Sequence, residues 1–327
     1  MNNLIAIYVF VFGLCFGSFL NVFVLRGLSG EGFVVARSKC PKCNNQLKWY
    51  MNIPLLSYIF LRGKCAFCGE KISIQYPIVE ALTATSFLIS YLTFGLTFKA
   101  LFVCLFFFFF IALSTTDILE TVIIDYHAYV LFILALIYAF FGLGDITLVQ
   151  ALIGGIGSFL LFEITARLGY LFVKYRMFGE GDSLIALALG AIFGIKNFLI
   201  IAFLSILIQS IIALPFLLFK AFNKKNYRLG FSYVIIIFAI CAVVYINFFA
   251  NMQNNITYTG YVILIITALL WSLKNILDSV KNKKELDFES AKEKFTLFPF
   301  GPAMIIAGTI GIFYINQIKI AIKMFLY

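Results

Sequence analysis

The chain has 327 residues, of which 63% are hydrophobic and 12% are charged, and its mean hydropathy is +1.02. This composition excludes a soluble domain and, because the apolar segments are continuous rather than alternating, also a transmembrane β-barrel. Together with the segments and motifs described below, it predicts an all-α polytopic membrane protein with about 8–10 transmembrane helices and a small cytoplasmic zinc-binding module. The net charge of +10 lies mostly in a few polar loops, which favours a topology signal over nucleic-acid binding.

Apolar stretches of spanning length recur from the first residues onward. They predict helices over 3–25, 79–98, 100–116, 126–144, 147–172, 183–195, 197–219, 231–250, 258–274 and 301–320. We expect residues 1–25 to form a retained first transmembrane helix, because its apolar run is too long for a signal peptide and lacks a basic start. A chain of ten helices that starts outside the cell places nearly all basic residues on the cytoplasmic side, in the loops 26–78, 117–125, 173–182, 220–230 and 274–300.

The polar insert over residues 26–78 contains two Cys-x-x-Cys pairs, Cys40/Cys43 and Cys65/Cys68. Each pair can present two thiolates to one metal ion, and two pairs complete a tetrahedral zinc site. Two disulfides are the alternative, but the basic flanks predict a reducing cytoplasmic location, where disulfides are rare. We therefore predict a structural Zn²⁺ ion that holds together a module too small to fold on its own core.

Two aspartates stand at the ends of apolar helices. Asp117 closes the predicted helix 100–116, which contains a run of five Phe residues that suits either lipid or core packing. Asp182 ends the segment Gly179-Glu180-Gly181-Asp182. A carboxylate near hydrocarbon is costly and so is a functional candidate. Two carboxylates that share one proton can activate water, which is the chemistry of an aspartic protease.

These carboxylates also have other interpretations. Asp117 could be a helix-end residue that faces headgroups, and Asp125 or Glu120 could replace it in the pair. The glycines Gly179 and Gly181 permit a close backbone approach, which suits a site that grips an extended substrate.

Two further polar groups near the predicted site have structural interpretations. Glu163 and Arg167 are four residues apart, which puts them on one helix face and predicts an ion pair. His127 is the sole histidine of the chain, and we expect it to be an interfacial residue at a helix start.

The chain resembles the type IV prepilin peptidases, which are bifunctional leader peptidase/N-methyltransferases of bacterial membranes. The matching segments occur in the family's order, and they are Gly17-Ser18-Phe19-Leu20-Asn21-Val22 with Arg26, the two Cys-x-x-Cys pairs, Asn52-Ile53-Pro54-Leu55-Leu56-Ser57-Tyr58, Leu61-Arg62-Gly63-Lys64-Cys65, Tyr76-Pro77-Ile78-Val79-Glu80, Asp117, the Gly-Glu-Gly-Asp segment at 179–182, and Pro299-Phe300-Gly301-Pro302. Each piece is short, but the ordered combination is specific and extends over most of the chain.

The resemblance implies catalytic roles for Asp117 and Asp182, with Gly179 and Gly181 supporting the active site. It implies cleavage of the basic leader from type IV prepilins or from the pseudopilins of type II secretion, at the cytoplasmic face of the bacterial inner membrane. N-methylation of the new N-terminus with S-adenosylmethionine is implied as well, and it is associated with the module at 26–78. The expected partners are these substrates and membrane lipid, without nucleic acid.

The expected domain organisation is a first helix at 1–25, the zinc module at 26–78 and a polytopic peptidase domain at 79–327. Three features depart from the family pattern: Leu184 stands where many relatives carry Lys, Ile124 replaces a usual Pro, and 231–274 resembles a two-helix insertion.

Two other function classes remain as alternatives: a transporter or channel with a zinc-bound regulatory loop, and an inactive scaffold of a secretion system. The transporter is disfavoured because the acidic residues gather at one face and no helix broken at the midplane is evident.

Overall fold

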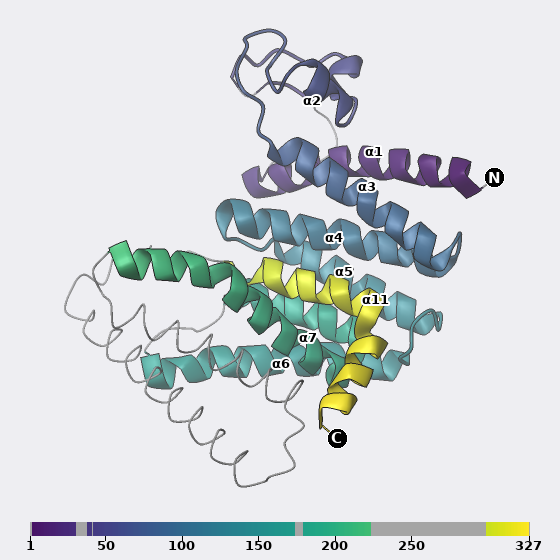
Figure 1. Cartoon of the computed structure of the whole chain (residues 1–327), viewed down its shortest axis with the longest axis vertical. Coiled ribbons are helices and arrows are strands. Elements are labelled where there is room, and N and C mark those ends of the chain that lie inside the picture. Colours follow the sequence, from purple (N-terminus) through teal and green to yellow (C-terminus); the bar gives the residue numbers. More distant parts are fainter. Residues whose placement is uncertain (1, 31–37, 41, 174–178, 224–298, 327) are drawn as a thin grey trace. The chain divides into compact units, whose positions relative to one another are not determined.

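The computed structural model describes residues 2–30, 38–40, 42–173, 179–223 and 299–326 (Figure 1). It divides into two compact units, Met1–Ser205 with Pro299–Thr309 and Ile206–Phe298 with Ile310–Tyr327. The site described below lies in the first unit. In the described part of the second unit, the chain is helical and consists of the ends of two long helices.

The described residues form helices and no named strand, which confirms the all-α prediction. The elements are α1 (Asn2–Ser29), η1 (Trp49–Asn52), α2 (Leu56–Phe60), α3 (Gln75–Phe94), α4 (Phe98–Glu120), α5 (Asp125–Phe140), α6 (Leu148–Val173), α7 (Glu180–Asn223) and α11 (Gly301–Leu326). Six of them contain a segment that is long and apolar enough to cross a membrane, and α5 is a shorter apolar helix. The chain is therefore a multi-pass membrane protein.

Several helix boundaries differ from the predicted ones for local reasons. The prediction of a helix over 79–98 is shifted by four residues, because α3 starts at Gln75 and ends before Gly95, which has a φ of 66°. Thr97 then caps α4 by accepting a hydrogen bond from the Ala100 N–H at 3.2 Å.

The predicted helices 183–195 and 197–219 are the two halves of α7, which bends at Gly194 (φ 72°, ψ 159°). The predicted boundary between the two helices, at residue 196, is therefore confirmed to within two residues, although the chain continues through the bend as one helix. The predicted helices 231–250 and 258–274 lie outside the described residues.

Helices α1 and α3 pack closely, and a Cβ atom added at Gly17 of α1 would lie 2.6 Å from the Cα atom of Glu80. Small residues allow such close approach between membrane helices, where packing rather than hydrophobic burial drives association. The buried Asn21 side chain adds a polar link, donating to the Tyr76 carbonyl at 3.2 Å.

The five consecutive Phe residues of α4, at 106–110, are all buried. Phe108 packs against Phe19 and Phe23 of α1, with ring centroids 6.2 and 5.7 Å apart. Phe106 contacts Tyr138 of α5 edge to face at 5.3 Å. Helix α4 therefore lies in the core, in contact with α1, α3 and α5 (Figure 1), and the Phe run belongs to protein packing rather than to the lipid boundary.

Candidate active site

Asp182 is buried in the first turn of α7. Its Oδ2 atom accepts a hydrogen bond from the Gly179 N–H at 3.0 Å, so the side chain reaches back to the residue that precedes the helix. This is the carboxylate half of a capping box, and it satisfies one of the free N–H groups at the helix start. The contact fixes the Asp182 carboxylate at the positive end of the helix macrodipole.

Asp117 is buried in the last turn of α4. The helix ends because Thr121 adopts a left-handed conformation (φ 53°, ψ 30°), and its N–H donates to the Asp117 carbonyl at 3.0 Å. The alternatives Glu120 and Asp125 are both exposed. Burial therefore distinguishes Asp117 from its two acidic neighbours.

Gly301, the first residue of α11, contacts both α4 and α7. A Cβ atom added there would collide with Oδ2 of Asp117 and would lie 3.0 Å from Cδ1 of Ile185. Ile185 follows Asp182 by about one helical turn. The end of α4, the first two turns of α7 and the start of α11 therefore meet around the Asp117 carboxylate.

Gly181 makes a second contact between the segments that bear the aspartates. A Cβ atom added at Gly181 would lie 2.5 Å from Cβ of Ile123, in the connection between α4 and α5. Any larger residue at 181 would therefore push the start of α7 away from the segment that follows Asp117.

The predicted Glu163–Arg167 ion pair is confirmed, with Arg167 Nε 2.9 Å from Glu163 Oε1. The same carboxylate accepts a hydrogen bond through Oε2 from the buried hydroxyl of Ser183, at 3.3 Å. Ser183 directly follows Asp182, so Glu163 connects α6 to the first turn of α7. This connection was not predicted, because the sequence does not show which face of α7 lies against α6.

His127 lies in the first turn of α5, as expected, but the expectation that it faces the membrane interface is wrong. Its side chain is fully buried, with its ring centroid 4.5 Å from that of Phe23 and 4.4 Å from that of Tyr126. Neither ring nitrogen has a hydrogen-bond partner among the described residues. The imidazole therefore packs as an aromatic ring between Phe23 and Tyr126.

The four cysteines Cys40, Cys43, Cys65 and Cys68 form one cluster of free thiols, with all sulfur atoms within 4.8 Å of one another. The two pairs have the same backbone structure. The Cys40 N–H donates to the Asn45 carbonyl at 3.0 Å, and the Cys65 N–H donates to the Glu70 carbonyl at 2.8 Å.

In each pair, the residue after the second cysteine has a positive φ, 55° at Asn44 and 72° at Gly69. The turns thereby direct two thiols each toward a common point.

The sulfur positions fit a tetrahedral metal site. The Cys40 and Cys68 Sγ atoms are 3.9 Å apart, and a Zn–S bond of 2.3 Å in a regular tetrahedron requires a separation of about 3.8 Å. Backbone N–H groups of Cys43 and Lys42 lower the pKa of the Cys40 thiol to about 7. A backbone hydrogen bond at Glu70 acts in the same direction on Cys68, but burial and the other thiols raise its pKa to about 11.

Four neighbouring thiols of this kind cannot all ionise without a cation, so the cluster could hold a metal ion.

Glu80 of α3 joins the cysteine module to the membrane helices. Its Oε2 atom accepts a hydrogen bond from the Leu55 N–H at 2.8 Å, and the carboxylate is buried. Leu55 has an unusual positive φ of 58°, which the contact helps to hold. The module is therefore attached to α3 by a partly buried hydrogen bond as well as by the chain itself.

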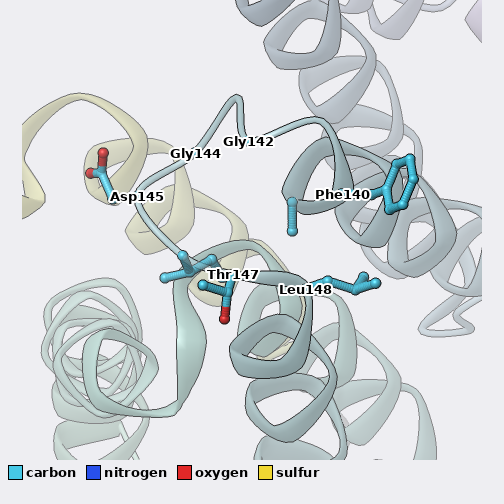
Figure 2. Close-up of a pocket in the computed structure, with 8 residues that line it drawn as sticks. Phe140, Gly142, Gly144, Asp145, Thr147 and Leu148 are labelled. Atoms are coloured by element: carbon cyan, nitrogen blue, oxygen red, sulfur yellow. The ribbon is translucent and has the colours of Figure 1, made fainter.

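A surface hollow lies at the C-terminal end of α5, in the turn between α5 and α6 (Figure 2). Its lining includes Asp145, Thr147 and Leu148, and Asp145 is its one titratable residue. Asp117 lies close in the chain to the N-terminal end of α5, whereas the hollow lies at the C-terminal end of that helix. The hollow therefore does not belong to the aspartate site.

Two family models match the chain. The model described as "Bacterial Peptidase A24 N-terminal domain" matches residues 11–94, which include α1, the cysteine cluster and α3. The model described as "Type IV leader peptidase family" matches residues 104–214, which include Asp117 and Asp182. Gly301 lies outside both matched ranges.

Curated relatives carry corresponding names. A "Prepilin leader peptidase/N-methyltransferase" of Myxococcus xanthus (strain DK1622) is 37% identical over 188 residues, which cover 58% of this chain and 56% of the relative. One of Vibrio cholerae serotype O1 is 33% identical over 202 residues, or 58% of this chain and 79% of the relative.

A "Type 4 prepilin-like proteins leader peptide-processing enzyme" of Escherichia coli O78:H11 is 32% identical over 197 residues, or 55% of this chain and 73% of the relative. The match thus spans just over half of the Myxococcus relative. No solved structure matches the chain significantly.

Proposed function

The chain belongs to the type IV leader peptidase family, as its motifs predict, and we propose that it cleaves the leader peptide from type IV prepilins or pseudopilins and N-methylates the new N-terminus. The observation that supports the peptidase function best is the burial of two carboxylates, Asp117 and Asp182, on segments joined by Gly301. Buried carboxylates at the ends of membrane helices are rare unless they are functional.

The proposed reaction uses one ionised and one neutral carboxyl group. The start of α7 and the Gly179 N–H stabilise negative charge on Asp182, so we assign it to take a proton from water. Asp117 lies at the opposite kind of helix end, where the macrodipole does not stabilise an anion, and we assign it to donate a proton to the scissile carbonyl. The resulting hydroxide attacks the carbonyl carbon to form a tetrahedral intermediate. The C–N bond then breaks, the leaving nitrogen takes the proton that Asp182 received from water, and the hydroxyl of the intermediate returns a proton to Asp117.

We propose that the reaction occurs at the cytoplasmic face of the bacterial inner membrane. Described residues 38–74 include six Lys or Arg residues and one acidic residue, Glu70, which favours a cytoplasmic location for the cysteine module. A cluster of free thiols also suits the reducing cytoplasm. A substrate helix could then lie along the spans while its basic leader stays in the cytoplasm.

We propose that Cys40, Cys43, Cys65 and Cys68 hold a structural Zn²⁺ ion. Four thiol ligands fill the tetrahedral coordination sphere and leave no position for a substrate. The ion would fix the two cysteine turns relative to each other. The methyltransferase function, with S-adenosylmethionine as donor, rests on the names of the relatives and is assigned to the region that contains this module.

The alternative of a transporter is disfavoured by the position of the one break in the described helices. Gly194 of α7 lies close to Ile146 in the turn between α5 and α6, and a Cβ atom there would be 3.5 Å from Ile146 Cγ2. Transporter sites use broken helices whose ends face an ion near the membrane midplane. The break in α7 instead has an apolar neighbour, Ile146, and lies twelve residues after Asp182 along the helix.

The function is tested by incubating the purified full chain in detergent with a prepilin and with labelled S-adenosylmethionine. We expect the leader to be released and the label to appear on the new N-terminal amine. Folded protein that processes none of several prepilins would favour the scaffold or transporter alternative.

Gly301→Ala is expected to lower prepilin cleavage by about 10²-fold, because the added methyl group collides with the Asp117 carboxylate and displaces a reacting group. The measurement is kcat with the prepilin, together with the thermal stability of the variant in detergent. Gly157→Ala is the matched control, since its methyl group would meet only the flexible end of Ile195, at 3.3 Å. Normal activity of Gly301→Ala would show that α11 does not border the site.

Ser183→Ala is expected to lower kcat about tenfold with little change in KM, because the lost hydrogen bond to a charged group is worth about 1.5–3 kcal/mol and positions the first turn of α7. Glu163→Gln should have a similar effect, and the double variant should be no worse than either single one. Ser205→Ala removes an equally buried hydroxyl that bonds within its own helix, to the Ile201 carbonyl, and should leave kcat unchanged. Independent, additive losses would contradict a positioning role.

A further inference from the structure

We propose that the cysteine module carries a contact surface for anionic lipid, formed by η1 and α2 and separate from the membrane-spanning helices. The lipid-contact face, as we name it, consists of the large apolar side chains of these two elements, Trp49, Tyr50, Leu56, Ile59 and Phe60. Neither the proposed peptidase function nor the metal site requires these side chains.

The side chains of the lipid-contact face are much more exposed than such residues usually are. Trp49 is 80% exposed, Phe60 79% and Ile59 66%. Single exposed apolar residues are normal on a protein surface, but a group of large ones marks an interaction site.

These side chains form a group for two structural reasons. Ile59 and Phe60 lie three and four residues after Leu56, so both are its neighbours on one face of α2. Trp49 and Tyr50 pack edge to face with ring centroids 5.8 Å apart, and η1 contacts α2. The exposed area is therefore one surface and not five isolated residues.

The connections of the module keep it close to the membrane. It begins after α1, which ends at Ser29, and it ends where α3 begins at Gln75, and both helices are of spanning length. The hydrogen bond from Leu55 to Glu80 attaches the segment between η1 and α2 directly to α3. The lipid-contact face is thus within reach of the headgroup layer.

Charge identifies anionic lipid as the occupant. Lys48 precedes Trp49 in the chain, with Nζ 6.0 Å from the Tyr50 ring centroid, and Arg62 follows Phe60 by two residues. Trp and Tyr beside Lys and Arg are typical of membrane interfaces, and basic clusters bind anionic headgroups. The same charge disfavours a basic leader peptide on this surface.

The experiment uses the fluorescence of Trp49 in the full chain. The protein has two tryptophans, Trp49 and Trp271, so Trp271→Phe leaves Trp49 as the single emitter. The zinc-loaded variant is placed in nanodiscs of phosphatidylcholine alone or mixed with phosphatidylglycerol, each with and without chains brominated close to the headgroup. We expect Trp49 emission to shift to shorter wavelength and to lose most of its intensity with brominated lipid, most strongly in anionic discs.

Two pairs of charge-removing substitutions test whether the basic residues beside the lipid-contact face cause the preference for anionic lipid. Lys48→Gln with Arg62→Gln should remove the preference for anionic discs, whereas Lys39→Gln with Lys71→Gln, an equal loss of charge at the cysteine turns, should not. If Trp271→Phe does not fold, the difference between the wild-type and Trp49→Phe spectra reports the same emission. A water-exposed spectrum without quenching would overturn the proposal. So would a blue-shifted but unquenched spectrum, which would mean that protein covers the face, or equal quenching in neutral and anionic discs.

Discussion

Asp182→Asn is expected to abolish prepilin cleavage, with a loss of at least about 10²–10⁴-fold, while the protein stays folded. General acid–base catalysis contributes factors of this size, and an amide can neither take a proton from water nor carry the negative charge that the start of α7 stabilises. Asp117→Asn should cause a loss of the same order, because both carboxyl groups are needed in one step. The measurement is single-turnover cleavage of a prepilin in detergent.

The matched control for both variants is Asp145→Asn. This carboxylate lies in the turn between α5 and α6 (Figure 2). None of the contacts described for the aspartate site involves it, so its loss should leave the rate unchanged. A thermal melt of each variant separates lost chemistry from lost structure. Full activity of either Asp117→Asn or Asp182→Asn would remove the aspartic mechanism and leave the family membership without its proposed active site.

Removal of zinc is expected to unfold the module that contains the four cysteines. Structural zinc binding has an apparent free energy of about 10–16 kcal/mol, far more than a small module with few buried apolar residues can supply by itself. Metal analysis of purified protein should find one zinc ion per chain. Cys40→Ser or a strong chelator should release it and expose residues 38–74 to proteolysis.

The same treatment should affect the two proposed activities unequally. The aspartate site is built from α4, α7 and α11, and its described contacts do not include the cysteines. We therefore expect methyl transfer to be lost while leader cleavage is reduced much less. Cys15→Ala, which removes a thiol of α1 outside the cluster, is the control. Protein without zinc, with Cys40 and its three neighbours oxidised in pairs, would overturn the metal site.

Family and function could be inferred from local patterns because the chemistry needs particular residue types at short spacings. Two cysteines on one turn are sufficient to predict half of a metal site, since the turn itself fixes the distance between the thiols. The structure repeats that turn at Cys40 and Cys65 with equivalent hydrogen bonds. Asp117 and Asp182 were identified for a similar reason, because a carboxylate at the end of an apolar helix is conspicuous in any sequence.

The roles of Gly301, Ser183 and Glu163 could not be derived in this way. Gly301 was noted only as part of a family motif, and its contact with Asp117 joins residues that are far apart in the chain. The hydrogen bond from Ser183 to Glu163 depends on the rotation of α7 against α6. Hydropathy does not encode that rotation, because α7 is apolar on all sides.

The sequence by itself determined the membrane class and the cysteine cluster, located most of the helices in the described residues, and singled out the two aspartates as candidates, all from composition and short-range spacing. Only the tertiary structure decided which apolar side chains face protein. Lipid and protein interior solvate a phenylalanine about equally well, so hydrophobicity alone cannot distinguish them. That is why the Phe run of α4 and His127 proved to be core residues, and why the surroundings of Asp117 became visible only once α4, α7 and α11 were packed together.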